Sequence, residues 1–96
     1  MSSPVAPDGP ADVRLVLYSR AGCHLCEPAA ALVAAVAAEA GTGWLAVDVD
    51  TDPDAAALTE RYGEMVPVVT VDGVVQGYWR LDAERLHRAL AAPRRG

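Results

Sequence analysis

The cysteine pair in Cys23-His24-Leu25-Cys26 lies between a strand pattern and a helix pattern, and this placement restricts the fold more than any other feature of the sequence. Residues 13–18 form a short, mostly apolar run that predicts a strand. After the pair, apolar residues recur at helical spacing, at Leu25, Ala29, Leu32 and Val36. The sequence therefore predicts a strand–helix unit that carries two sulfur atoms at its turn. A disulfide at this spacing opens and closes without movement of the rest of the fold.

The position of each cysteine predicts its chemistry. A thiolate, not a thiol, attacks a disulfide, and the free amides and dipole of a helix N-terminus favour negative charge. We therefore expect Cys23, at the start of the helix, to be the catalytic nucleophile. Cys26, one turn further in on the same face, is expected to be the resolving thiol that displaces a mixed disulfide. Arg20 and a protonated His24 would add a positive field at this site.

One residue conflicts with a regular helix that begins at Cys23. In such a helix residue 28 donates a hydrogen bond to the carbonyl of His24, and Pro28 has no N–H to donate. Two alternatives remain open from the sequence. Either the first turn is irregular, or the regular helix begins nearer Glu27.

Other functions use the same two cysteines. A purely structural disulfide is disfavoured because closing so short a loop removes only about 2 kcal/mol of chain entropy. A zinc site needs four ligands, and the only histidine besides His24 is His87, so no metal site is expected from one chain. A shared iron–sulfur cluster needs further thiols from a partner. A metal- or cluster-binding module and a redox-inactive adaptor remain the alternatives to an oxidoreductase.

Composition limits the setting of the protein. The 96 residues, 52% hydrophobic and 22% charged, indicate one globular domain, and a net charge of −5 disfavours nucleic acid as a partner. No run is long enough to span a membrane. Residues 1–12 hold three prolines and neither a basic segment nor an apolar run, which predicts a flexible tail and no secretory signal. A cytoplasmic location follows, where a close cysteine pair is more often catalytic or metal-binding than structural.

The middle of the chain predicts a second strand and a second helix. We expect the strand over residues 44–49. Asp52 and Pro53 are then expected as the N-cap and first residue of the helix. The helix would bury Ala55, Leu58 and Tyr62 and stop at Gly63.

The last third predicts a hairpin and a third helix. Residues 66–71 and 74–79 are two β-rich runs joined by the turn Asp72-Gly73. Gly77 within the second run predicts a bulge or a close backbone approach. The final helix is expected to begin at Asp82, to bury Leu86 and Leu90 and to end before Pro93. The resulting order, βαβαββα, is that of an α/β fold with three helices and a mixed sheet.

This layout, with the segment from Tyr18 to Cys26 and the pair Val66-Pro67, resembles a glutaredoxin-like protein of the thioredoxin superfamily, closest to its small bacterial members. The resemblance covers residues 13–92 as one domain, with tails at 1–12 and 93–96. It implies a thioredoxin-like fold whose four-stranded sheet has the order 2-1-3-4. It also implies a thiol–disulfide oxidoreductase that reduces disulfides of proteins or small thiols. No cofactor is then expected beyond the redox-active Cys23–Cys26 disulfide, with an external thiol or a reductase as electron donor and a monomeric state.

The resemblance also implies a substrate site. Pro67 is expected to follow a cis peptide bond and to face the cysteines, so that the N–H and C=O groups of Val66 dock the substrate. Arg20 stands where glutaredoxins often carry a lysine for a glutathione carboxylate. Tyr78 and Trp79 are either an apolar platform beside the thiols or aromatic rings packed on the third helix. Further substrate contacts are expected from His24, Leu25 and Arg80.

The chain departs from the glutaredoxin pattern where glutathione binds. Glutaredoxins use a Gly-Gly pair and an aspartate near the start of the last helix. Counted from Pro67, these positions hold Gly77, Tyr78 and Arg80, so a bulky ring and a cation replace a glycine and a carboxylate. Weak or atypical glutathione binding is therefore expected, with Asp82 as the alternative carboxylate.

Overall fold

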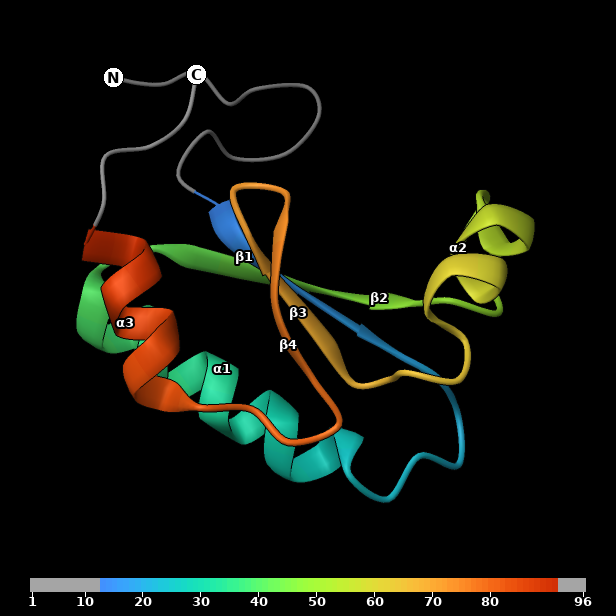
Figure 1. Ribbon diagram of the computed structural model, residues 1–96, viewed down its shortest axis with the longest axis horizontal. Helices are drawn as coiled ribbons and strands as arrows, with labels where there is room; N and C mark the ends of the chain where they lie inside the picture. The colour runs from blue at the N-terminus through green and yellow to red at the C-terminus, as the bar shows by residue number, and fades with distance from the viewer. Residues whose placement is uncertain (1–12, 92–96) are drawn as a thin grey trace.

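The computed structural model describes residues 13–91 (Figure 1). Its elements, in chain order, are β1 (Val13–Ser19), α1 (Cys26–Ala40), β2 (Gly43–Asp48), α2 (Ala55–Tyr62), β3 (Val68–Val71), β4 (Val74–Tyr78) and α3 (Ala83–Ala91). The sheet has the order β2-β1-β3-β4, with β1 parallel to β2 and antiparallel to β3, and β3 antiparallel to β4. The predicted α/β class, element order and thioredoxin-like sheet order are confirmed. The predicted tails and Pro93 lie outside the described residues.

The main core lies between the sheet and two helices. Figure 1 shows α1 and α3 together on one face of the sheet. Alternate residues of the central strands point to this face, and they are almost fully buried: Leu15, Leu17, Val69 and Val71. From α1 the core receives Val33 and Val36, and from α3 it receives Leu86 and Leu90, as predicted for the third helix. Trp44 packs against the same core.

A second, smaller core lies where α2 meets the other side of the sheet. It consists of Val49, Tyr62 and Val68. The ring of Tyr18 lies against that of Tyr62, with centroids 4.7 Å apart. Burial raises the pKa of Tyr18 above its ordinary value of 10, and the charges of Tyr62 and Asp52 add to the effect. This small core fixes α2 to the end of β1, next to the cysteine segment.

The predicted start of the second helix is wrong by two residues. The helix begins at Ala55, with Asp54 at its N-cap. Asp52 instead accepts a hydrogen bond of 2.9 Å from the backbone N–H of Asp54. Its carboxylate therefore stabilises a turn that precedes the helix. The predicted stop at Gly63 is confirmed.

The hairpin strands are shorter than predicted, and the second strand is displaced by one residue, to 43–48 instead of 44–49. β3 begins at Val68 because the residue before it is a proline, which cannot donate to the ladder. In the register between β3 and β4, Val69 pairs with Gly77 and Thr70 with Val75. One extra residue is left between these pairs in β4, so the predicted irregularity at Gly77 is confirmed as a bulge.

The turn and the third helix follow the sequence signals. Asp72 and Gly73 both have positive φ angles, 52° and 85°, as the favoured hairpin turn requires. The carboxylate of Asp82 accepts a hydrogen bond of 2.9 Å from the N–H of Glu84, so Asp82 caps α3 as predicted. Among residues 13–91, no helix has both the length and the apolar character needed to cross a membrane.

Candidate redox site

The register of the sheet brings the predicted site residues to one end of the molecule. Tyr18 pairs with Val68, and Val68 pairs with Tyr78, so one row of residues crosses three strands. Beyond this row, β1 leads to the cysteine pair, the chain before β3 holds the Val66-Pro67 bond, and β4 leads to Trp79. Three segments far apart in the sequence therefore meet at the same end of the sheet, where these strands begin or end.

Cys23 and Cys26 are joined by a disulfide, with their Cα atoms 5.4 Å apart, and both residues are half-buried. The regular helix begins at Cys26, with Leu25 at its N-cap. The expectation that Cys23 begins the helix is therefore wrong, because Cys23 lies in the turn before it. The alternative, a regular helix that begins nearer Glu27, is confirmed. The first regular helical bond runs from the N–H of Ala29 to the carbonyl of Leu25, at 3.1 Å.

Pro28 accounts for this start. It occupies the first turn of α1, where backbone N–H groups have no partner within the helix. The amide of Glu27, in the same turn, has no acceptor among residues 13–91. Such amides point away from the body of the helix, toward the residues that precede it. The electrostatic field of the helix N-terminus thus acts on the turn that holds Cys23.

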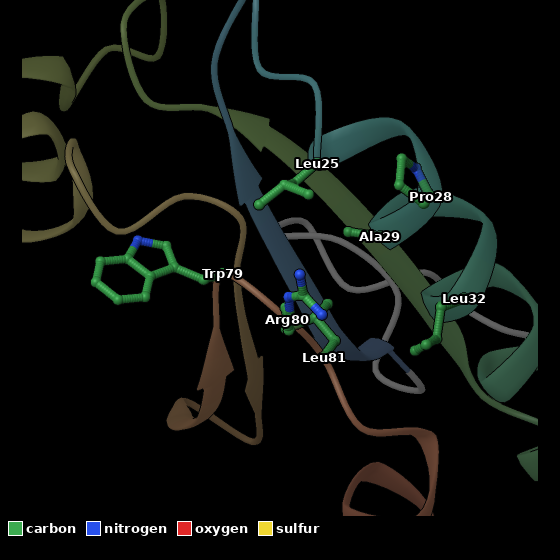
Figure 2. A pocket seen from close by; sticks show the side chains of 7 residues that line it. All are labelled: Leu25, Pro28, Ala29, Leu32, Trp79, Arg80 and Leu81. Carbon is green, nitrogen blue, oxygen red and sulfur yellow. The ribbon is translucent and has the colours of Figure 1, made fainter.

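Two predicted contact residues flank the disulfide on the α1 side. Leu25, between the cysteines, is 45% exposed and lines a groove together with Arg80 (Figure 2). His24 is exposed, and its ring has no hydrogen bond to any residue that the structure describes. Both side chains are thus accessible to a bound molecule.

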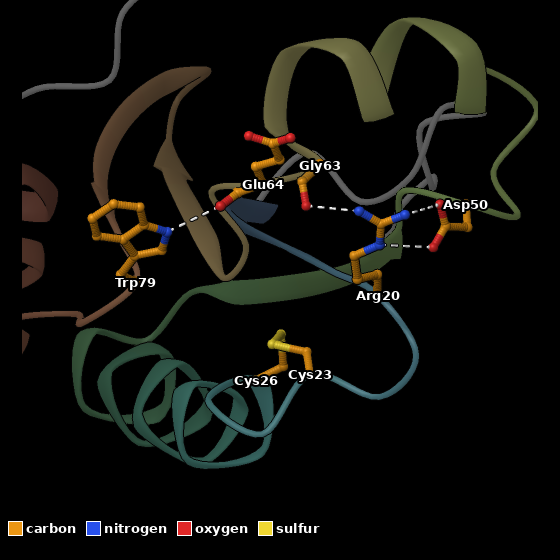
Figure 3. Close-up of a disulfide and its surroundings, with 7 residues drawn as sticks. All are labelled: Arg20, Cys23, Cys26, Asp50, Gly63, Glu64 and Trp79. Atoms are coloured by element: carbon orange, nitrogen blue, oxygen red, sulfur yellow. Dashed lines mark hydrogen bonds and ion pairs between the residues drawn. A yellow bond between two sulfur atoms is a disulfide. The ribbon is translucent and has the colours of Figure 1, made fainter.

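The guanidinium of Arg20 is bound to other residues of the protein. Its Nε and Nη2 atoms donate to the two carboxylate oxygens of Asp50, at 3.0 and 2.9 Å. Its Nη1 atom donates to the carbonyl of Gly63, at 2.8 Å (Figure 3). The side chain is 37% exposed. Arg20 therefore links the segment before the cysteines to the loop after α2, a structural arrangement that the sequence did not indicate.

The bond between Val66 and Pro67 is cis, as predicted. Pro67 is buried, and its carbonyl accepts a hydrogen bond of 2.9 Å from the backbone N–H of Trp79. The N–H and C=O groups of Val66 have no hydrogen-bond partner within residues 13–91. They are therefore available to pair with an extended chain, as the ladder of a sheet edge does.

Tyr78 and Trp79 form an exposed aromatic pair. They are 46% and 54% exposed, and their rings meet edge to face with centroids 5.2 Å apart. Trp79 has a positive φ angle of 64°, and its Nε1 atom donates a hydrogen bond of 3.1 Å to the carbonyl of Glu64 (Figure 3). Both rings are thus exposed, and their role as a platform beside the thiols stays a prediction. No motif or spacing in the sequence indicates the contact with Glu64.

His87, the other histidine, and possible groups of metal ligands remain to be placed. His87 pairs with Glu39 at 2.8 Å on the surface of the α1–α3 layer. Within the part of the chain that the structure describes, no three His, Cys, Asp or Glu residues gather closely enough to hold a metal ion.

The chain is similar to proteins of known sequence and structure. A family described as Glutaredoxin-like domain (DUF836) matches residues 14–91. The Mycobacterium tuberculosis relative named Uncharacterized protein Rv0508 is 34% identical over 77 residues, which are 78% of this chain and 79% of the relative. The X-ray structure of target protein XcR50 from X. campestris is 38% identical with a TM-score of 0.56, over 82% of this chain and 99% of that one. The solution structure of protein Ne2328 from Nitrosomonas europaea is 27% identical with a TM-score of 0.64, over 92% and 96%.

Proposed function

Because the chain belongs to the glutaredoxin-like domain family, we propose that it is an enzyme, a thiol–disulfide oxidoreductase that reduces disulfides of proteins or of small thiols. A glutaredoxin-like domain with a disulfide-bonded pair of cysteines supports a thiol–disulfide redox function in general. The observation that carries the finer proposal is the disulfide itself. It lies at the start of α1, at the same edge of the sheet as a cis-proline loop whose Val66 backbone groups have no partner within residues 13–91.

The proposed reaction transfers two electrons from the reduced cysteine pair to the substrate. The Cys23 thiolate attacks one substrate sulfur, the substrate disulfide breaks, and the departing thiolate takes up a proton. The Cys26 thiolate, formed by loss of its proton, then attacks the sulfur of Cys23 in the mixed disulfide. The second substrate thiol leaves, and the Cys23–Cys26 disulfide forms. An external dithiol, or two equivalents of a monothiol, reduces the pair again. No resident cofactor takes part.

Docking beside the cis peptide bond would align the substrate for this attack. The N–H and C=O groups of Val66 pair with the backbone of an extended segment that holds the substrate disulfide. The exposed faces of Leu25, His24 and Tyr78 then lie around the bound segment. Such backbone pairing is independent of side chains, so it supports action on more than one disulfide substrate.

Glutathione is proposed to be a poor partner. Arg20, the expected site for one of its carboxylates, is already bound to Asp50 and Gly63. Arg80 presents a cation to the glutathione ammonium, and the carboxylate of Asp82 is engaged in capping α3. A charged hydrogen bond contributes roughly 1.5–3 kcal/mol, so its loss weakens a complex about tenfold to a hundredfold. A different small thiol or a reductase is therefore the proposed electron donor. The protein is further proposed to be a monomer and to act in the cytoplasm.

A reduction assay tests the proposal. The oxidised protein is mixed with a peptide disulfide and, in separate reactions, with dithiothreitol, with glutathione, and with a thioredoxin reductase and its nicotinamide donor. We expect turnover with dithiothreitol and at most a few per cent of a glutaredoxin control with glutathione. A protein that reduces no disulfide with any donor would refute the proposed activity. Turnover with glutathione equal to the control would refute the specificity.

A further inference from the structure

A shallow groove of about 270 Å³ begins beside the cysteine pair, between the first half of α1 and the connection from β4 to α3. Its apolar lining includes Leu25, Leu32, Trp79 and Leu81. Leu25, which lines one end of the groove, stands between the two cysteines in the chain, so this end of the groove lies next to the cysteine segment. Large exposed apolar side chains that gather at one place mark a surface for binding.

One cation faces this groove. Arg80 is the only charged residue among those that line it. In Figure 2 its side chain extends from the connection after β4 toward the α1 residues. Its guanidinium has no ion pair or side-chain hydrogen bond to residues 13–91, in contrast to Arg20, which is bound to Asp50. In a chain of net charge −5, an unpaired cation beside an apolar groove is complementary to an anionic group on a ligand.

We propose that this groove selects the substrate of the proposed oxidoreductase: a polypeptide disulfide whose cysteine is flanked by a bulky apolar residue and by an acidic residue. The apolar side chain fills the groove between Leu25 and Leu32, and the carboxylate pairs with Arg80. The inference rests on the proposed function, because it assigns the substrate to the same cysteine pair.

The size of the groove favours a side chain over a whole small molecule. Pockets that enclose drug-sized ligands start at about 300 Å³ and surround most of the ligand, whereas this groove is smaller and open. An extended segment that pairs with Val66 leaves its side chains free to occupy such a groove. Glutathione has no bulky apolar side chain, so it leaves the apolar part of the groove empty.

Binding is tested separately from chemistry, on the oxidised protein, by chemical shifts of its backbone amides. Three peptides are titrated, each with serine in place of cysteine so that no disulfide exchange occurs. The first has leucine and aspartate beside the serine, the second has glycine and aspartate, and the third has leucine and lysine. We expect the first to shift the amides of Leu25, Leu32 and Arg80 most strongly. Equal shifts for all three peptides, or shifts confined to other residues, would overturn the proposal.

Selectivity is tested with the corresponding peptide disulfides and dithiothreitol as donor. An exposed ion pair accounts for a preference of up to about fivefold in kcat/KM. We expect the wild type to prefer aspartate to lysine by this factor and Arg80→Glu to invert the preference. Arg88→Glu, on the exposed face of α3 outside the groove, is the matched control for net charge and is expected to keep it.

The outcomes separate the two proposals. Equal rates with all peptide disulfides leave the oxidoreductase in place and overturn the selective groove. If no disulfide is reduced, the proposed function fails, and the amide shifts still decide whether the groove binds the acidic, apolar peptide.

Discussion

The Nη1 atom of Arg20 donates a hydrogen bond of 2.8 Å to the carbonyl oxygen of Gly63. This bond joins the segment that leads into the cysteine pair to the loop that leads into the cis peptide bond. The approach is close, since a Cβ atom at Gly63 would lie 3.2 Å from the same nitrogen and 2.5 Å from the carbonyl of Thr59. Arg20 therefore ties together the two segments that hold the cysteine pair and the cis peptide bond, and we expect it to position them relative to each other.

Replacement of this arginine tests the positioning. Arg20→Lys keeps the positive charge and loses the planar fork that binds Asp50 and Gly63 together. We expect it to lower the free energy of unfolding by about 1–2 kcal/mol and to lower kcat more than it raises KM. Arg88→Lys is the matched control. A large rise in KM for anionic substrates, with kcat and stability unchanged, would contradict this account and would return Arg20 to substrate binding.

Trp79 holds the same loop from its other side. Its backbone N–H bonds to Pro67 and its indole Nε1–H bonds to Glu64. Trp79→Phe keeps an aromatic ring and removes the indole bond. We expect a loss of stability of roughly 0.5–1.5 kcal/mol in urea denaturation, with a lower rate of disulfide reduction.

Trp44→Phe supplies the comparison for the Trp79 variant, because Trp44 packs against the core on the other edge of the sheet. It is expected to reduce stability without a specific loss of activity. If Trp79→Phe matches the wild type in both measurements, the indole bond does not position the loop.

Tyr18 makes stability depend on pH in the alkaline range. Burial raises its pKa above 10 in the folded protein, so the folded state keeps a proton that the unfolded state releases. The free energy of unfolding therefore falls as the pH rises from about 10 through the folded pKa. Urea denaturation of the oxidised protein at about pH 8 and about pH 10.5 measures the difference. Tyr18→Phe is expected to reduce the fall of the free energy of unfolding between these pH values. Tyr78→Phe, at an exposed ring, is expected to leave this fall unchanged.

The sequence predicted the parts of the fold that depend on local signals. The hairpin turn at Asp72-Gly73, the cap at Asp82 and the irregular strand at Gly77 each follow from one residue type with a known backbone preference. The order of the strands and the cis bond at Pro67 came from a family resemblance. Pro28 left two starts of α1 open from the sequence, and the later one, near Glu27, is the one observed. The start of α2 was misplaced because Pro53 is compatible with a position in a first turn or in the turn before it.

The site contacts that the sequence missed depend on residues brought together by the fold. Arg20 meets Asp50 and Gly63 across 30 and 43 positions of the chain. The exposed conformation of Trp79 depends on its positive φ angle and on a carbonyl 15 residues away. Neither partner is marked by spacing or composition. The same holds for the groove beside Arg80, which forms only where α1 passes the connection after β4.

Trapping of the mixed-disulfide intermediate tests most directly the proposed roles of Cys23 as nucleophile and Cys26 as resolving thiol. Cys26→Ser, reduced and mixed with a peptide disulfide, is expected to accumulate a mixed disulfide that peptide mass mapping locates at Cys23. Cys23→Ser is the matched control, and it is expected to form no adduct at Cys26 on the same timescale. An adduct that accumulates at Cys26 in Cys23→Ser, with none at Cys23 in Cys26→Ser, would contradict the assignment and reverse the two roles.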